Sequence, residues 1–342
     1  MNASAQRLTR RRPPGHALVL SLAALLLAAA AASAGDKTEP GPVALSTKVL
    51  QLDPEDPKRE SIGRLIWRGG IEITSQASRF GGLSGLLVSG DGARLLAVSD
   101  RGNWLSARLR YDAGGRLIGL EDGQMARLRD LDGDAISKKR LRDAEDLAEL
   151  ADGSIVVSFE DEHRIWRYDT DQGRPLSRPT AWPNPEGLED APDNSGLEAL
   201  TDLADGGLLA LTENQEAGAG KAGYLWRDGA WSRLTYRPVA DFKPTSASRV
   251  PGGGDVLVLE RTAHLLGGFN VRLVRIAAGD IRPGAALHGE QLARWGAPLT
   301  IDNFEAVAAR RAADGTIPIY LLSDDNFSPL QRTLLLMFAL EE

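Results

Sequence analysis

The sequence of 342 residues contains no cysteine. Disulfide bonds, thiolate chemistry and cysteine-based metal sites are therefore excluded. Histidine is scarce as well, with four residues, and none of them follows a metal-ligand spacing such as H-E-x-x-H. The fold must therefore be stabilised by its hydrophobic core, and any metal site must use oxygen ligands.

Long apolar runs are also lacking, with one exception near the N-terminus. The run Ala17–Ala32 follows a basic start that contains four arginines and no acid. Residues 32–34 fit the small-x-small pattern of a cleavage site. We therefore interpret residues 1–34 as a signal peptide that is cleaved after Ala34. An uncleaved anchor and a twin-arginine signal are the alternatives.

Cleavage would leave 308 residues and would change the formal charge from −7 to −11, because four arginines are lost. This negative charge argues against nucleic acid and anionic membranes as partners. No later segment is long and apolar enough to span a membrane. We expect a soluble monomer, periplasmic or secreted, exported by the general secretion route rather than the twin-arginine route.

From Leu65 onward, the chain repeats one pattern of strands and turns every 48 to 61 residues. Each repeat has a hairpin and a third strand, and most repeats have a fourth. A D-G turn between apolar runs is a strong hairpin signal, and four strands per repeat at this period are typical of propeller blades. We predict an all-β fold, a β-propeller with five blades, six being possible. The turn glycines are Gly92, Gly153, Gly206, Gly254 and Gly315.

A strand from the start of the propeller can supply the strand that its last repeat lacks. The last repeat runs out of chain after its third strand, whereas Gly63–Thr74 is a strand without a repeat of its own. We predict that this strand closes the ring. The domains are then the signal peptide 1–34, an N-terminal leader 35–62 with a strand within Val43–Leu52, and the propeller 63–342. A β-sandwich is the structural alternative, but it does not explain the repeated order of strands.

Three repeats carry two acids at mirror-image distances around the D-G turn. If each turn has two residues, the two acids face each other across the ladder, where like charges repel. In a propeller these positions share the mouth of the central channel opposite the D-G turns. The pairs are Glu145 with Glu160, Glu198 with Glu213, and Glu305 with Asp324. The acids expected at this mouth are Asp100, Glu145, Glu160, Glu198, Glu213, Glu260, Glu305 and Asp324.

Such a ring of carboxylates needs compensation, because two carboxylates about 6 Å apart repel by roughly 3 kcal/mol at an effective dielectric near 20. Either some of them hold protons at raised pKa, or positive charge lies among them. An all-oxygen site suits Ca²⁺ better than Mg²⁺. Alternatively, the acids are solvated and only prevent edge-to-edge pairing. The metal ligands that we predict are Glu145, Glu198, Glu305, Asp324, Asp325 and Asn326.

Several segments resemble the exported phytase-like family, whose domain is often named for an esterase-like activity of phytase. They cover the chain from roughly Phe80 to Leu340. The resemblance implies a β-propeller outside the cytoplasm that hydrolyses a phosphoester or an ester. Some members have glycine after the acid where this chain has Asp146, Ala199 and Ala306, so we expect a tighter mouth here. The matching segments are Phe80–Leu86, Ser99–Gly102, Ala144–Leu147, Gly196–Leu200, Leu259–Arg261, Asn303–Ala306 and Ser323–Phe327.

Two classes of function follow. In a hydrolase, a metal ion would polarise the scissile group and activate water, and a carboxylate would act as the base. Arg101, Arg261 and Lys243 would then bind an anionic small-molecule substrate. The alternative is a non-catalytic propeller of the cell envelope that binds a ligand or a protein. The catalytic residues that we predict are Asp100, Arg101, Glu160, Glu213, Glu260 and Arg261.

Overall fold

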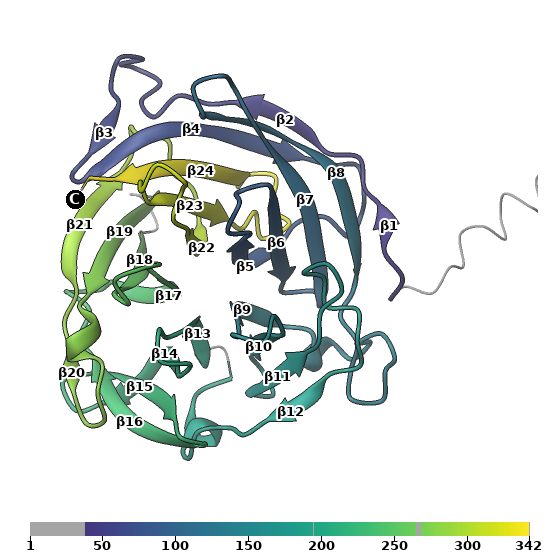
Figure 1. The fold of residues 1–342 in the computed structure, drawn as a ribbon, viewed down its shortest axis with the longest axis vertical. Coiled ribbons are helices and arrows are strands. Elements are labelled where there is room, and N and C mark those ends of the chain that lie inside the picture. The colour runs from purple at the N-terminus through teal and green to yellow at the C-terminus, as the bar shows by residue number, and fades with distance from the viewer. Residues whose placement is uncertain (1–37, 194, 265–267, 342) are drawn as a thin grey trace, which may run out of the picture.

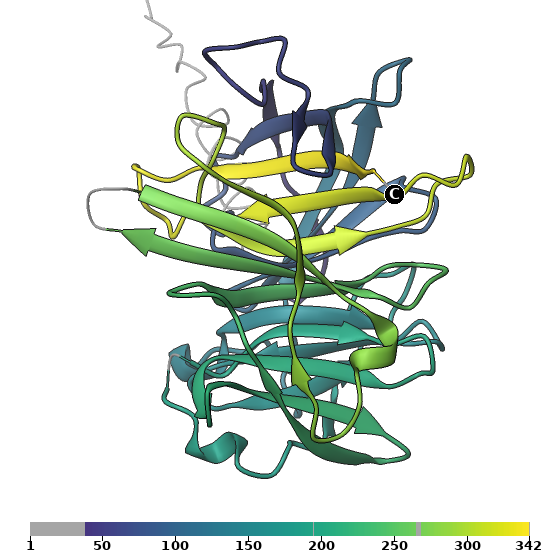
Figure 2. The same cartoon turned by 90° about the vertical axis from the view of Figure 1, so that its left-hand side faces the viewer.

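The computed structural model describes residues 38–193, 195–264 and 268–341. They form a β-propeller, in which antiparallel strand groups surround a central axis (Figure 1). In side view, the strands run from one face of the molecule to the other (Figure 2). The predicted signal peptide lies outside the described residues. In the part of the chain that is described, no helix is long and apolar enough to cross a membrane.

Each group begins with its innermost strand, and the following strands lie progressively further out. The first group contains β5 (Leu83–Val88), β6 (Arg94–Ser99), β7 (Asn103–Tyr111) and β8 (Leu117–Arg127). The second contains β9 (Ala144–Glu149), β10 (Ile155–Phe159), β11 (Arg164–Tyr168) and β12 (Thr180–Trp182). The third contains β13 (Leu197–Asp202), β14 (Leu208–Ala217), β15 (Gly220–Arg227) and β16 (Ala230–Tyr236), with β20 (Ala286–Leu287) parallel to β16.

The remaining two groups complete the circle, so the described strands form five antiparallel groups of four. The fourth contains β17 (Lys243–Arg249), β18 (Val256–His264), β19 (Gly268–Ile276) and β21 (Glu290–Gly296). The fifth contains β22 (Phe304–Ala309), β23 (Pro318–Ser323), β24 (Thr333–Leu340) and β4 (Leu65–Thr74). Within the described residues, three short 3₁₀ turns lie in connections, at Lys139–Leu141, Leu188–Asp190 and Ala278–Asp280.

The ring is closed by a strand from the beginning of the propeller, as predicted. β4 pairs antiparallel with β24, from Thr333 opposite Ile73 to Leu340 opposite Leu65. Its backbone therefore supplies the fourth strand that the end of the chain lacks. A single parallel bridge between Gly69 and Leu117 also connects β4 to β8 of the first group.

The described part of the predicted N-terminal leader packs onto the propeller. β1 (Gly41–Pro42) pairs with β8, whereas β2 (Ser46–Val49) and β3 (Ser61–Ile62) pair with β4. Leu52 is 1% exposed and belongs to the core between the fourth and fifth groups. The described part of residues 35–62 thus extends the outer edge of the closing strands, because unpaired strand edges there find backbone partners.

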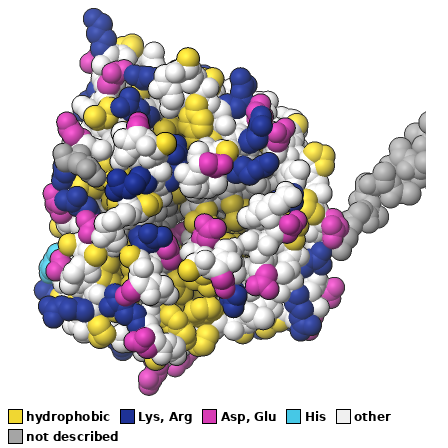
Figure 3. All heavy atoms as spheres, in the orientation of Figure 1, with side chains coloured by type: hydrophobic (Ala, Val, Ile, Leu, Met, Phe, Trp, Pro, Cys, Tyr) yellow, Lys and Arg dark blue, Asp and Glu magenta, His cyan; other side chains and the backbone are white. Residues whose placement is uncertain are grey.

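Apolar side chains fill the spaces between neighbouring groups. Leu209 and Leu211 of the third group, for example, pack with Val256 and Val258 of the fourth. A separate apolar cluster of this kind lies between each pair of neighbouring groups. Both faces of each sheet are therefore buried, and the axis is left to side chains of the inner strands. The face drawn in Figure 3 is hollowed near its centre, where acidic and basic side chains lie among apolar ones.

Candidate active site at the acidic mouth

Every inner strand contains a β-bulge near its start. In β13 the pairing passes from Leu197 opposite Thr212 to Ala199 opposite Leu211, which leaves Glu198 out of the ladder. β22 does the same at Glu305. A bulge bends the strand and turns the extra residue away from the regular ladder. The bulge residues are Ser84 with Gly85, Glu145 with Asp146, Glu198, Thr245, and Glu305.

A second ring of side chains lies on the second strands at the mouth, directly after β6, β10 and β23 and within β14 and β18. The backbone N–H of Glu160 donates to Asp143 O at 2.8 Å, and that of Asp324 donates to Asn303 O at 2.9 Å. The first and third groups repeat this bond, so the five groups present equivalent positions at the same end of the axis. The residues at these positions are Asp100, Glu160, Glu213, Arg261 and Asp324. We call the acids Asp100, Asp143, Glu145, Glu160, Glu198, Glu213, Glu305 and Asp324 the acidic mouth.

The expectation that paired acids face each other directly is wrong. The turn after β9 is a three-residue loop, closed by a bond from Leu150 N to Ser154 O, and not a two-residue turn. This loop moves the register by one residue, and the bulge moves it again, so that Asp143 and not Glu145 lies opposite Glu160. The acids still gather at one mouth, because the bulges direct them toward it.

Two pairs of carboxyl groups in the mouth are hydrogen-bonded to each other. Glu160 bonds with Glu198, and Asp143 bonds with Glu145. Because ionised carboxylates have no donor, each of these bonds requires a proton on one of its two partners. Glu160 also accepts a hydrogen bond from the backbone N–H of Gly196. The mouth therefore compensates part of its charge by binding protons.

Burial and mutual repulsion raise the pKa values of these acids. Burial raises the pKa of Glu160 to about 8, and the nearby Glu145 adds to the effect. The pKa of Glu198 is raised by burial and then by the charges of Glu160, Glu213 and Glu305. Groups that titrate near neutral pH can give and take protons, which makes this cluster suited to acid–base chemistry.

The segments Ser99–Gly102 and Ser323–Phe327 supply the other side of the mouth. Burial raises the pKa of Asp100 to about 7, with a further contribution from Asp143. One oxygen of Asp100 is buried without a hydrogen-bond partner among the described residues. Burial also raises the pKa of Asp324 to about 8, where Glu305 and Asp100 add their repulsion. Asp100 is thus an acid held near its titration point at neutral pH.

Two of the three predicted substrate-binding cations are already paired with acids. Arg261 lies 3.1 Å from the carboxylate of Glu305, and Lys243 lies 3.4 Å from that of Glu213. Both come from the fourth group, which has Thr245 where its neighbours carry an acidic bulge residue. This group therefore neutralises part of the ring. Arg101 is different, because its guanidinium lies over the ring of Phe327, 3.1 Å from the ring centroid.

Glu260, predicted as a catalytic residue, does not join the mouth. It is 0% exposed and accepts hydrogen bonds from Tyr236 at 2.5 Å and from Arg272 at 2.6 Å. It pairs with Pro244 inside the ladder, and the next residue, Arg261, takes the position at the mouth. Successive residues of a strand point to opposite sides, so Glu260 faces the core.

Asp325 and Asn326, predicted as metal ligands, shape a turn instead. Asp325 accepts hydrogen bonds from the backbone N–H groups of Gly82 and Phe327, both at 3.0 Å. Its other oxygen accepts a bond from Thr333. Asn326 is exposed, and its side chain donates to Gln331 at 2.7 Å. The oxygens of Asp325 are therefore occupied by donors of this chain.

Below the mouth, the carboxylate of Asp146 crosses the axis. One of its oxygens accepts hydrogen bonds from Leu200 N at 2.9 Å, Ser246 Oγ at 3.1 Å and Ala247 N at 3.2 Å. Burial raises its pKa to about 8, whereas these bonds act in the opposite direction. The side chain of Asp146 therefore connects inner strands by hydrogen bonds, whereas the expectation of a tighter mouth stays a prediction.

The donor chemistry of the mouth suits calcium, but the described geometry does not form a ligand set. Among residues 38–193, 195–264 and 268–341, no group of three or more acids or histidines is arranged so that it could hold a metal ion. Most of the carboxyl groups pair with one another or with Arg261 and Lys243, whereas Asp100 and Asp324 do not. We therefore derive no chemical step from a bound metal.

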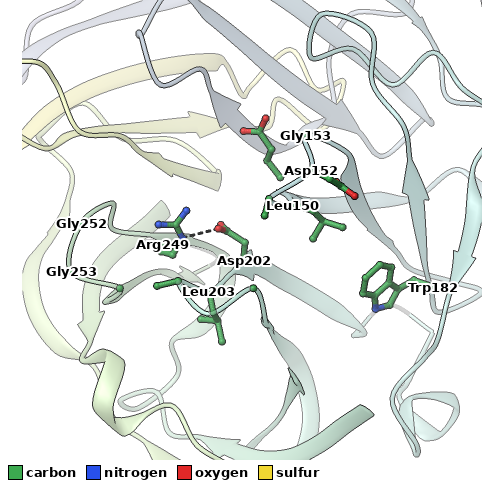
Figure 4. Close-up of a pocket in the computed structure, with 14 residues that line it drawn as sticks. Leu150, Asp152, Gly153, Trp182, Asp202, Leu203, Arg249, Gly252 and Gly253 are labelled. Carbon is green, nitrogen blue, oxygen red and sulfur yellow. Dashed lines mark hydrogen bonds and ion pairs between the residues drawn. The ribbon is translucent and has the colours of Figure 1, made fainter. Parts of the chain in front are cut away.

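A separate cleft of about 840 Å³ lies on the face of the D-G turns. Figure 4 shows Arg249 and Asp202 pointing toward each other in this cleft, where they form an ion pair of 2.7 Å. Asp152 is likewise paired with Arg167 at 2.8 Å. Because Arg249, Asp202 and Asp152 are paired within the chain and the turns contribute mainly glycine and alanine, we place the candidate site at the acidic mouth.

Sequence reasoning missed two acids at the centre. Asp143 precedes the bulge and bonds with Glu145, and Asp146 connects the inner strands. Aligning the repeats on their bulges would have found Asp143, which occupies the position of Gly82, Gly196, Lys243 and Asn303 in the other repeats. No pattern in the sequence indicated that Asp146 would reach across the axis.

Residues 78–327 match the model of the Phytase-like family, which is described as "Esterase-like activity of phytase". The matched region contains the residues of the acidic mouth. No curated protein matches the sequence.

Two solved structures of low sequence identity are similar to this chain to different degrees. The catalytic domain of a GH62 α-L-arabinofuranosidase from Coprinopsis cinerea has a TM-score of 0.52 at 11% identity, over 81% of this chain and 97% of that one. A gluconolactonase from Xanthomonas campestris has a TM-score of 0.41 at 14% identity, over 87% and 95% of the two chains. The first supports the fold, and neither says what this chain acts on.

Proposed function

Since the chain belongs to the Phytase-like family, we propose that it hydrolyses an ester or a phosphoester at the acidic mouth. One observation carries the proposal: Asp100, with a pKa raised by burial to about 7, stands next in the chain to the stacked guanidinium of Arg101. A carboxyl group that titrates near neutral pH, beside a cation, can support proton transfer at an oxygen that gains negative charge.

The residues of the mouth have distinct roles in this proposal. The ionised carboxylate of Asp100 accepts a proton from the attacking water. Arg101 donates hydrogen bonds to the carbonyl or phosphoryl oxygen, on which charge develops. The Glu160–Glu198 pair holds a proton that passes to the leaving oxygen as the ester bond breaks.

The fourth group has a supporting role. Arg261 and Lys243 neutralise Glu305 and Glu213, which lowers the negative charge that an anionic substrate meets. Glu213 is assigned to this neutralisation and not to proton transfer. Glu260 and Arg272 stabilise the sheet from within. Calcium remains a hypothesis, with Glu145, Glu198 and Glu305 as the acids whose repulsion it would relieve.

The location belongs to the proposal as well. We place the mature protein outside the cytoplasm, because residues 1–34 have the composition of a signal peptide. We also propose that the mature protein is a monomer. Mass spectrometry of the protein recovered from its natural host measures the N-terminus directly. A mature chain that begins at Gly35 supports this location, and one that retains residues 1–34 contradicts it.

A substrate screen tests the proposed reaction. The panel contains p-nitrophenyl acetate and p-nitrophenyl phosphate, each with Ca²⁺ and with a chelator. For the ester that is cleaved, we expect Asp100→Asn to lower kcat at least 100-fold, within the range of about 10²–10⁴ for a general base. Asp91→Asn, at an exposed turn, is the matched control and should leave kcat within twofold of the wild type.

The same screen can contradict either the proposed hydrolysis or the proposed role of Asp100. Absence of hydrolysis by the wild type would favour the alternative of a non-catalytic propeller that binds a ligand or a protein in the cell envelope. An active enzyme in which Asp100→Asn has no effect would keep the hydrolase and move the base elsewhere in the mouth.

A further inference from the structure

Arg101 is a cation at the mouth that forms no ion pair among the described residues. Arg261 and Lys243 form ion pairs with Glu305 and Glu213. Among the described residues, no hydrogen bond or ion pair engages the guanidinium of Arg101, and the side chain is exposed. Its N–H groups therefore remain available to an oxygen-bearing ligand, since stacking covers the face of a guanidinium and leaves its edges open.

The ring of Phe327 holds this guanidinium in place. The two groups are 3.1 Å apart, measured from Arg101 Cζ to the ring centroid. An exposed arginine samples many rotamers, and a cation over an aromatic face loses much of this freedom. The orientation of Arg101 beside Asp100 thus depends on where the loop 323–327 puts an aromatic ring.

The backbone adopts an unfavourable conformation to put that ring there. Asn326 and Phe327 have φ angles of +47° and +50°, in the left-handed region that residues with side chains rarely occupy. Phe327 is a bulky residue, for which such a φ is exceptional. Strain of this kind persists only where the surroundings enforce it, and it is concentrated at functional sites.

The contacts around Phe327 hold its backbone in this conformation. Asp325 accepts the N–H groups of both Gly82 and Phe327, which ties the loop to the first group. Glycine at positions 81 and 82 leaves room for the ring, because a Cβ on Gly82 would lie 2.5 Å from the Phe327 ring and one on Gly81 would lie 2.9 Å from it. The two loops are therefore fitted around one aromatic side chain.

We propose that Phe327 is a positioning residue that holds Arg101 as the phosphate-binding group of the mouth. This inference rests on the proposed function, because it specifies which chemical group of the substrate the mouth recognises. The ligand is a phosphate group, bound by the open edge of the Arg101 guanidinium.

The test measures binding of inorganic phosphate to the purified protein at pH 6 by calorimetry. We expect Phe327→Leu to raise the Kd for phosphate at least tenfold, because the guanidinium loses its support. Phe327→Tyr keeps the aromatic face and should stay within threefold of the wild type. Arg101→Ala should weaken binding at least as much as Phe327→Leu does.

A double-mutant cycle separates positioning from general damage. If Phe327 acts through Arg101, Phe327→Leu has no further effect on the Kd in the Arg101→Ala background. If it only supports the fold, the two effects add, and the proposal is overturned. Should Phe327→Leu not fold, Arg101→Lys decides, because lysine keeps the charge without the flat, stacked fork. We expect at least fivefold weaker binding, and unchanged binding would overturn the proposal.

The outcomes for binding and for hydrolysis are independent of each other. A wild type that does not bind phosphate overturns the role of Phe327 and Arg101, even if a neutral ester is hydrolysed in the screen. A wild type that binds phosphate through Arg101, with the expected cycle, supports it even if no ester in the panel is cleaved. In that case the proposed hydrolysis fails and the phosphate site stands.

Discussion

The hydroxyl group of Ser246 on β17 donates a hydrogen bond of 3.1 Å to the carboxylate of Asp146 on β9. These strands belong to groups that are not neighbours, so the bond crosses the axis of the propeller. The oxygen of Ser246 in turn accepts the N–H of Val307 on β22 at 3.1 Å. With the bond from Leu200 N to Asp146, four inner strands are connected through one buried carboxylate.

Asp146→Asn should destabilise the protein by about 1–3 kcal/mol, because an amide nitrogen replaces one acceptor and faces N–H groups that then lack a partner. Urea unfolding at pH 7 measures the free energy directly. Asp152→Asn, in an exposed turn, is the matched control and should unfold at the wild-type urea concentration. Equal stability of Asp146→Asn and the wild type would show that the bonds across the axis are not important for the fold.

Glu260→Gln should destabilise the protein by about 3–5 kcal/mol, because Arg272 is left as a buried charge without its partner. The kcat of the folded variant should remain within twofold of the wild type, since Glu260 lies outside the mouth. Urea unfolding and the active ester from the screen provide the two measurements. Glu290→Gln, in an exposed ion pair, is the control. A loss of kcat without a loss of stability would restore Glu260 as a catalytic residue.

Stability should decrease as the pH rises from about 5 to 8. The pKa values of Asp100, Glu160 and Asp324 are raised to about 7, 8 and 8, whereas unfolded carboxyl groups titrate near 4. The folded state therefore binds more protons than the unfolded state in this range, and raising the pH favours unfolding. Melting temperatures across the range test this, and Glu160→Gln should flatten the decline. A melting temperature that rises from pH 5 to 8 would contradict the raised pKa values.

Glu198→Gln tests the repulsion in the mouth and the calcium hypothesis together. With chelator, the variant should be as stable as the wild type or more stable by up to about 1 kcal/mol, because a repulsive charge is removed. If calcium binds there, it should raise the melting temperature of the wild type more than that of the variant, since binding stabilises the native state by mass action. Glu186→Gln, an exposed acid elsewhere, should behave as the wild type. Calcium that shifts neither protein would exclude the calcium hypothesis.

The sequence alone was enough to predict the propeller and its closure. D-G turns between apolar runs, repeated at a regular interval, indicate hairpins that are too small to bury their own faces. The missing fourth strand of the last repeat indicated a partner elsewhere, and β4 is that partner. The accumulation of acids at one mouth also followed from the repeat, because equivalent positions in each repeat lie at the same end of the axis.

The register within each repeat was decided only by the tertiary structure. Three-residue loops and the bulges of the inner strands moved Glu145 and Glu198 away from the partners that simple counting assigned to them. The turn of the fourth group is longer, with four residues between Val250 and Asp255, so counting selected Glu260 where the structure places Arg261. A shift of one residue has this effect because side chains alternate between the two faces of a strand. The same reason explains why Glu260, which forms a buried ion pair with Arg272, was predicted to be a catalytic acid.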